Sequence, residues 1–241
     1  MSAKRTDSNG YTIIFSIVMV VVVGSLLAFF ANATKPMRDN NDKVKTQIDI
    51  LSAMGVEANR TNATETFNQY IKKQLVIEGT TATENNEAYL IDIKKEQQAA
   101  KEGKVQRLPL FIGEKEGKTI YIIPVRGNGL WDAIWGYVAL NDDLKSINGV
   151  YFDHKGETPG LGANITEPFF EDDFKGEMIY DAAGNYKAVE ISKSNADPNN
   201  EDKTDNQVDA ISGATITGNG VGAMLKKGIG LYLPYFETLK K

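Results

Sequence analysis

The chain has 241 residues, 41% of them hydrophobic, and a formal net charge of −5, which allows one sizeable domain and a smaller segment. It has no cysteine and one histidine, His154, so disulfides, iron–sulfur clusters and thiol nucleophiles are excluded and His-based zinc or hydrolase chemistry is disfavoured. We therefore expect no catalytic side chain and no metal site. The acidic charge balance, without a dense Lys/Arg cluster, argues against a nucleic-acid partner.

An uncharged apolar run over residues 11–31 predicts one transmembrane helix, since at about 1.5 Å per residue it spans a hydrocarbon core of roughly 30 Å. The alternative is a signal peptide, because Lys4 and Arg5 precede the run and residues 31–33 resemble a cleavage site. The run is long for that role, which favours an uncleaved anchor behind a tail over residues 1–10. Basic residues flank both ends, so charge leaves the orientation open.

Residues 32–78 are expected to form a stalk and a helical segment. An amphipathic helix is predicted over residues 43–54, after a break at Pro36, and a second helix over residues 64–75. The polar residues 79–87 predict a loop.

The remainder, residues 79–241, is predicted to be an α+β domain with an antiparallel sheet and flanking helices, because short strand patterns are separated by turns and helices lie at both ends. A polar, acidic stretch at residues 198–209 is expected to be an exposed loop, and residues 221–233 a C-terminal helix that ends or kinks at Pro234. The strands are expected at residues 89–93, 108–112, 119–125, 134–140 and 149–152.

The most informative motif is DAISGATIT at residues 209–217, which places three hydroxyls and two small residues ahead of a helix. Free amides and the helix dipole stabilise a phosphate at such a position, and Gly213 and Ala214 allow the phosphate to approach the backbone. Thr215 is then a phosphate ligand or the point of attachment. The alternative is an ordinary helix cap, for which Ser212, Thr215 or Thr217 serves equally well.

Two further loops are candidates for contact with a flat ligand. In GETPGLG, residues 156–162, Glu157 and Thr158 are placed to bond a heteroaromatic ring edge and Leu161 to cover a ring face, with Gly160 and Gly162 allowing close approach. In GNGLWD, residues 127–132, Trp131 is placed to stack on a ring. For either loop alone, a plain turn or a core aromatic is the competing interpretation.

DAISGAT resembles the flavinylation sequence Asp-x-x-Ser/Thr-Gly-Ala-Thr, in which a dedicated flavin transferase esterifies the last threonine, here Thr215, with the phosphate of FMN. The motifs GNGLWD, GETPGLG and DAISGATIT, in that order behind one N-terminal anchor, closely resemble the C subunits of sodium-translocating NADH:quinone oxidoreductases. This resemblance covers nearly the whole chain.

The resemblance implies covalent FMN on Thr215, with Trp131, Thr158 and Leu161 beside the isoalloxazine ring. It implies a single-pass protein of the bacterial inner membrane, whose domain lies outside the cytoplasm beside other membrane subunits of a complex that oxidises NADH, reduces quinone and pumps Na⁺. NADH is expected to react elsewhere, because the glycine-rich residues 218–222 lack GxGxxG spacing. The alternatives are a G-type subunit of a ferredoxin-linked Rnf complex and a cofactor-free, membrane-anchored adaptor.

Overall fold

The computed structural model describes residues 8–194 and 197–239, and it divides into two compact units, residues 1–43 and 44–241. The first unit contains helix α1 (Asn9–Ala33), which has no buried residue and is long and apolar enough to cross a membrane by length and composition. It begins two residues before the predicted span and ends two residues after it. Of the tail expected over residues 1–10, residues 1–7 lie outside the described part of the chain.

Helix α2 (Lys35–Ala53) is longer than the predicted stalk helix, because Pro36 does not end a helix here. Pro36 is the second residue of α2. A backbone N–H at this position has no acceptor within the helix, so proline, which lacks the N–H, loses no hydrogen bond there. The interruption is confined to Thr34, whose hydroxyl donates a 2.8 Å hydrogen bond to the carbonyl of Phe30. The C-terminal half of α2, including Ile50 and Leu51, is buried.

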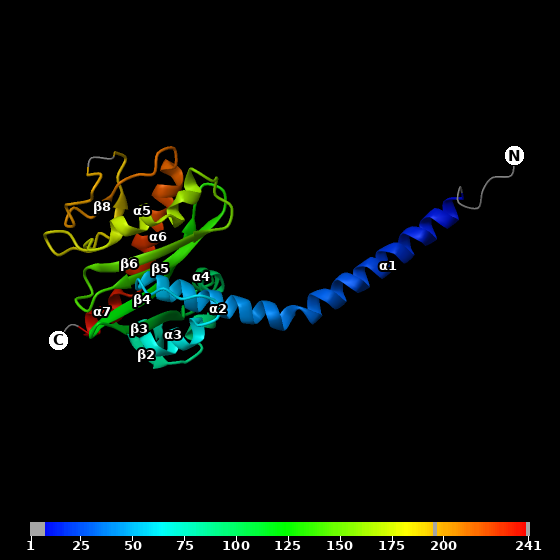
Figure 1. Ribbon diagram of the computed structural model, residues 1–241, viewed down its shortest axis with the longest axis horizontal. Helices are drawn as coiled ribbons and strands as arrows, with labels where there is room; N and C mark the ends of the chain where they lie inside the picture. Colours follow the sequence, from blue (N-terminus) through cyan, green and yellow to red (C-terminus); the bar gives the residue numbers. More distant parts are fainter. Residues whose placement is uncertain (1–7, 195–196, 240–241) are drawn as a thin grey trace. The chain divides into compact units, whose positions relative to one another are not determined.

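The second unit is built on a six-stranded sheet with the order β2-β1-β3-β4-β5-β6, and every neighbouring pair is antiparallel (Figure 1). This confirms the predicted α+β class with an antiparallel sheet. The strands are β1 (Ile71–Glu78), β2 (Thr81–Glu84), β3 (Leu108–Lys115), β4 (Lys118–Asn128), β5 (Ala133–Leu140) and β6 (Ile147–His154).

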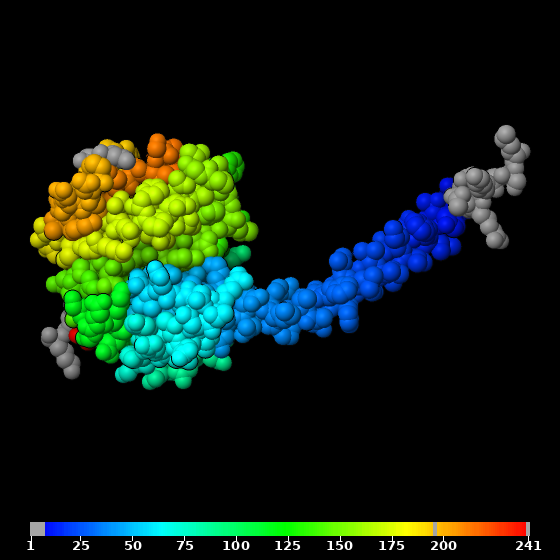
Figure 2. All heavy atoms as spheres, viewed as in Figure 1, coloured from blue at the N-terminus to red at the C-terminus, as the bar shows by residue number. Residues whose placement is uncertain are grey.

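Both faces of the sheet are covered, because apolar residues alternate between two separate cores. In β4, Ile122 belongs to the core under α2 and α3 (Ala63–Tyr70), whereas Ile123 belongs to the core under α6 (Thr215–Gly230) and α7 (Leu233–Leu239). Figure 2 shows the cyan segments of α3, β1 and β2 at one end of the domain and the yellow and orange segments after β6 at the other. The shorter helices are η2 (Ala88–Leu90), α4 (Ile93–Lys101), η3 (Gly162–Thr166), α5 (Pro168–Glu171) and η4 (Asp172–Phe174).

Two predictions upstream of β3 are wrong. The strand expected at residues 89–93 is instead the end of η2 and the start of α4, which Asp92 caps by accepting hydrogen bonds from the amides of Lys94 and Lys95. The helix expected over residues 64–75 ends at Tyr70, and its last apolar residues belong to β1. Pairing of β1 with β3 decides this, since a short apolar run alone does not distinguish a strand from a helix.

Two expected loops contain short strands. Residues 79–87 include β2, and the stretch at 198–209 includes β8 (Gln207–Val208), which pairs in parallel with β7 (Glu190–Ile191). The second stretch is not uniformly exposed, because Asn200 and Asn206 are buried. The side-chain amide of Asn206 donates to the carbonyl of Met178 at 2.5 Å, which ties the stretch to the domain.

The C-terminal helical region starts earlier than predicted and is divided in two. Helix α6 begins at Thr215 and ends at Gly230, and Pro234 is the second residue of α7 rather than the end of a helix. Glycines bring α6 close to the sheet: a Cβ atom on Gly228 would lie 2.6 Å from Cγ1 of Val125. Gly228 lowers the helix propensity of this segment but allows α6 to pack closely on β4.

Candidate functional site

Three loops that are far apart in the sequence meet at one edge of the sheet. Strands β4 and β6 are both antiparallel to β5, so their carboxyl ends lie at the same edge, where Asn128 pairs with Ala133 and His154 with Ile134. Residues 129–132 follow β4 and residues 155–162 follow β6. The third loop, residues 209–214, leads into α6.

The buried carboxylate of Glu157 joins these loops. Its exposed fraction is 4%; Oε1 accepts a hydrogen bond from the amide of Trp131 at 3.0 Å, and Oε2 accepts one from the hydroxyl of Thr217 at 2.6 Å. Burial by itself raises the pKa of this carboxyl, but the Thr217 hydroxyl and the amides of Trp131, Leu130 and Asp132 outweigh burial and lower it. Glu157 is therefore an ionised group whose two oxygens are both engaged by the protein.

Glycine is required beside this carboxylate. A Cβ atom on Gly162 would lie 2.5 Å from Oγ1 of Thr217 and 2.6 Å from Oε2 of Glu157, and one on Gly129 would lie 2.6 Å from Oε1 of Glu157. These separations are far below van der Waals contact, so a side chain at either position displaces the carboxylate. The glycines of both motifs thus allow the loops to close around Glu157.

Above the carboxylate, Trp131 and Leu161 present apolar side chains to solvent. The indole of Trp131 is 69% exposed, and its Nε1 donates to the hydroxyl of Thr158 at 3.2 Å. Gly160 has a φ of 77°, which turns the chain so that Leu161 reaches Gly213, where a Cβ atom would lie 2.8 Å from Cδ2 of Leu161. The structure therefore brings together residues from all three motifs.

In the part of the chain that the structure describes, no side chain caps the start of α6. Its N-cap residue is Ala214, and Thr215 is the first helical residue. The amides of the first helical turn have no acceptor within the helix, so they are available to an anion. Thr217 is 1% exposed and its hydroxyl is bonded to Glu157, whereas Ser212, Gly213 and Thr215 are exposed. The helix-cap interpretation of this motif thus has no capping hydroxyl to support it.

Two residues of the site were missed in the sequence. Leu130 and the 58%-exposed Ile216 join Trp131 and Leu161 as exposed apolar side chains of the three loops, and we call these four residues the apolar rim. A signal was present for Ile216, because it lies off the buried stripe of α6 that contains Val221 and Leu225. A single exposed apolar residue is ordinary, but a group of them from three loops, such as the apolar rim, indicates a binding surface.

Comparison with known proteins identifies the family. Residues 129–230, which contain the rim, Glu157 and Thr215, match the FMN-binding domain family. The C subunit of the Na(+)-translocating NADH-quinone reductase of Pseudomonas aeruginosa is 30% identical over 93% of this chain and 92% of its own length. Its counterpart in Vibrio vulnificus is 31% identical over 83% and 85%. The chain belongs to the family of C subunits of these reductases.

The solved structures of this family agree with the assignment. The crystal structure of the C subunit from Parabacteroides distasonis has a TM-score of 0.73 and 32% sequence identity, covering 83% of this chain and 96% of that chain. The family resemblance expected from the motifs GNGLWD, GETPGLG and DAISGATIT is thereby confirmed.

Proposed function

We propose that this chain is an electron-transfer subunit that carries FMN through a phosphoester bond to Thr215, within a membrane complex that oxidises NADH, reduces quinone and pumps Na⁺. The observation that carries the proposal is the start of α6, where an exposed threonine hydroxyl, free backbone amides and an uncapped helix coincide beside an exposed apolar rim. The matching FMN-binding domain and the related C subunits support the same cofactor and complex.

The residues present fit FMN. Amides of the first turn of α6 would hold the phosphate, and Gly213, with a φ of 73° and an exposed backbone, leaves room for it. The apolar rim would cover the isoalloxazine ring, with Thr158 near its edge. FMN supplies the redox chemistry by accepting and donating electrons, and the protein fixes its position and surroundings.

Attachment is a condensation at Thr215. The bond that forms joins Oγ1 of Thr215 to the phosphorus of the FMN group. The bond that breaks joins that phosphorus to the leaving oxygen of an activated flavin nucleotide bound by the flavin transferase, and the leaving group takes up the hydroxyl proton of Thr215. Thr217 is unsuited to this role, since its hydroxyl is buried and donates to Glu157. Ser212 is the remaining exposed hydroxyl of the motif and provides a matched control.

Helix α1 supports a single membrane anchor, and by the family resemblance we place the domain outside the cytoplasm. Other membrane subunits of the complex are its partners. A covalent tether suits that location, because FMN lost there is not readily replaced.

The test is expression of the full chain with its flavin transferase, followed by denaturing electrophoresis and intact mass. The wild-type protein and Ser212→Ala are expected to fluoresce in the gel and to carry the mass of FMN less one water, while Thr215→Ala and Thr215→Val fold, insert and carry neither. The N-cap of α6 is Ala214, so these substitutions remove no capping hydrogen bond, and even the loss of a cap, about 0.5–2 kcal/mol, is survived by a domain of ordinary stability. Retention of the added mass by Thr215→Val would refute the proposal.

The identity of the co-purifying subunits distinguishes a sodium-translocating NADH:quinone reductase from a ferredoxin-linked Rnf complex. Absence of flavin from correctly matured wild-type protein would instead favour the cofactor-free adaptor.

A further inference from the structure

A basic groove lies beside helix α4, and its lining does not include Thr215. Pairing of β3 with β4 ends at Phe111 and Ile122, and beyond that point α4 lies beside β4, where the side-chain amide of Gln97 donates to the carbonyl of Arg126 at 3.0 Å. Between α4, the end of β4 and α6 is a cavity of about 750 Å³. Its charged lining residues are Asp92, Lys94, Lys95, Lys101, Arg126 and Lys227.

The charge of this groove is opposite to that of the chain. Five cationic side chains and one carboxylate line it, although the whole chain has a net charge of −5. The single carboxylate, Asp92, accepts hydrogen bonds from the amides of Lys94 and Lys95 at 2.9 and 3.3 Å. Within residues 8–194 and 197–239, no salt bridge involves Lys94, Lys101, Arg126 or Lys227. Lys155 and, more weakly, Arg126 lower the pKa of the Asp132 carboxyl, so the positive charge that the groove offers to an external group comes mainly from Lys94, Lys101 and Lys227.

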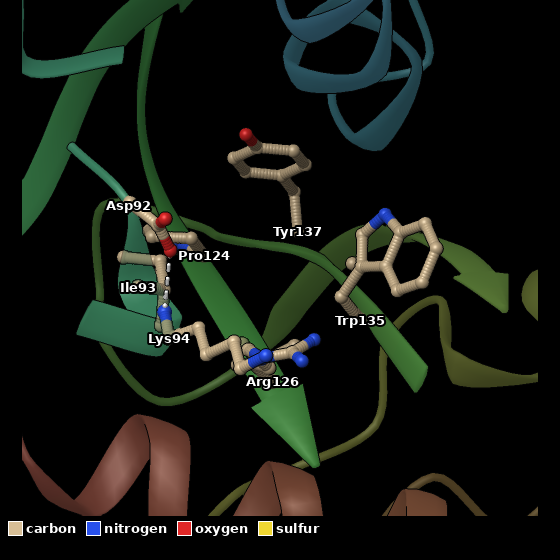
Figure 3. Close-up of a pocket in the computed structure, with 9 residues that line it drawn as sticks. Asp92, Ile93, Lys94, Pro124, Arg126, Trp135 and Tyr137 are labelled. Carbon is tan, nitrogen blue, oxygen red and sulfur yellow. Dashed lines mark hydrogen bonds between the residues drawn. The ribbon is translucent and has the colours of Figure 1, made fainter. Parts of the chain in front are cut away.

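The same groove opens into an aromatic pocket. A second cavity of about 360 Å³ shares Asp92, Lys94 and Arg126 with the basic groove and adds Pro124, Trp135 and Tyr137 as walls (Figure 3). Trp135 lies opposite Arg126 and Tyr137 opposite Pro124 in the β4–β5 ladder, so the four residues share one face of the sheet. Trp, Tyr and Arg are the residues that most often dominate binding energy at protein interfaces.

We propose that this groove docks an acidic segment of a partner protein. One large apolar side chain of the partner enters the pocket walled by Pro124, Trp135 and Tyr137, and its carboxylates meet the cations of α4, Arg126 and Lys227. Charge complementarity selects an acidic partner. An apolar pocket of about 360 Å³ beside a group of cations suits one large apolar side chain next to carboxylates, as an acidic protein segment presents them.

The position of the groove suggests which partner it serves. Asn128 lines the groove and is followed directly by Gly129 and the rim residues Leu130 and Trp131. Gly220 of α6 also lines the groove and packs against the carbonyl of Asn128. A protein seated in the groove thus lies beside the loop that we assign to FMN. We infer from this position that the partner is a redox subunit of the same complex. That inference rests on the proposed function, whereas the docking surface itself does not.

The test is amine labelling of the wild-type chain, read by peptide mass spectrometry, in three samples: the purified complex, the isolated full chain in detergent, and the isolated full chain in nanodiscs that contain anionic phosphatidylglycerol. Lys101 and Lys227 are expected to react about tenfold more slowly in the complex only, relative to the exposed Lys73 and Lys118 as internal controls. Equal labelling in all samples overturns the proposal. Protection in the nanodiscs without other subunits also overturns it and assigns the surface to the membrane.

A charge-reversal pair provides the second arm. Lys101→Glu/Lys227→Glu is expected to lower co-purification of the partner subunits about tenfold at low ionic strength, while Lys73→Glu/Lys118→Glu leaves it unchanged. In-gel flavin fluorescence is recorded for every variant. Normal assembly of the first pair contradicts the docking surface, whereas absence of flavin in all samples contradicts only the proposed function.

Discussion

The hydroxyl of Thr217 donates a 2.6 Å hydrogen bond to Oε2 of Glu157, which lies 60 positions earlier in the chain. The other oxygen of Glu157 accepts from the amide of Trp131. One buried carboxylate therefore holds the first turn of α6 against two loops of the sheet edge. Displacing it is expected to change the geometry of the apolar rim without touching Thr215.

Replacement of this carboxylate is the first prediction. Glu157→Gln keeps the shape but presents an NH₂ group to donors that need an acceptor, so the free energy of unfolding is expected to fall by about 1–3 kcal/mol in urea titrations. The bound flavin is expected to remain attached and to show a shifted absorbance or potential. Glu167→Gln is the control, because Glu167 is exposed and its side chain caps no helix. An unchanged spectrum and unchanged stability for Glu157→Gln would show that the carboxylate is not a positioning group.

The difference in unfolding free energy between wild type and Glu157→Gln is expected to depend on pH with a definite sign. The pKa of Glu157 is lowered in the folded protein, so its ionised form contributes stability above the unfolded pKa of about 4.3. This contribution is lost as the pH falls through the lower, folded pKa. The stability gap between wild type and Glu157→Gln is therefore expected to be full at pH 7 and to shrink in acid below about pH 4. A gap that widens on acidification contradicts this assignment.

The indole N–H of Trp131 gives a second prediction. Trp131→Phe removes the hydrogen bond to Thr158 but retains an aromatic face, whereas Trp131→Ala removes both. If the rim covers the flavin, Trp131→Ala is expected to shift flavin absorbance or potential more than Trp131→Phe, and Leu161→Ala is expected to shift them as well. Covalent attachment should survive in all three variants. Unchanged spectra and potentials in Trp131→Ala and Leu161→Ala would exclude this placement of the ring.

Gly213 gives a third prediction, which concerns attachment. Gly213→Ala places a Cβ atom 2.8 Å from Cδ2 of Leu161 and forces a non-glycine residue to a φ of 73°. The left-handed conformation costs roughly 1–2 kcal/mol for such a residue. We expect slower flavinylation in a time course of in-gel fluorescence while the fold is retained. Gly184→Ala is the matched control, since it has a similar φ of 84° but nothing within 4 Å of the new Cβ. Equal flavinylation rates for the two variants would mean that the contact at Gly213 does not matter.

A fourth prediction concerns Glu177, which is fully buried away from the flavin site. Burial raises the pKa of its carboxyl to about 7, aided by Asp205 and Asp202 and opposed by the amide of Asn200 at 3.0 Å and by Lys203. Among residues 8–194 and 197–239, its Oε2 atom has no hydrogen-bond partner.

Because the folded protein retains a proton that the unfolded chain releases, stability is expected to fall as the pH rises from about 4.3 to about 7. Glu177→Gln removes this dependence and keeps the oxygen that accepts from Asn200. The variant is expected to be more stable than wild type by ~1–3 kcal/mol at pH 8 and similar to it at pH 4, as measured by thermal or urea unfolding. If Glu177→Gln is less stable than wild type at pH 8, the raised pKa of Glu177 is contradicted.

The failures of the sequence patterns have two causes, contacts with residues distant in the chain and a local helix cap. Residues 71–75 fit a helical pattern as long as their strand partners are ignored, and residues 89–93 fit a strand pattern as long as the Asp92 cap is ignored. Pairing with β3 makes the first segment a strand, and the side-chain cap of Asp92 makes the second the start of α4. The loop at 198–209 was expected to be exposed because its residues are polar, yet Asn200 and Asn206 find backbone partners inside the domain.

Local composition and spacing were enough to predict the apolar length of the anchor and the α+β class, while the family was indicated by the resemblance of three motifs to known C subunits. Composition and spacing did not distinguish the hydroxyls of Ser212, Thr215 and Thr217 as candidate helix caps. The folded domain separates these hydroxyls, because it buries Thr217 against Glu157 and leaves Ser212 and Thr215 exposed. Burial and hydrogen-bond partners come from residues distant in the chain, so no local pattern reports them.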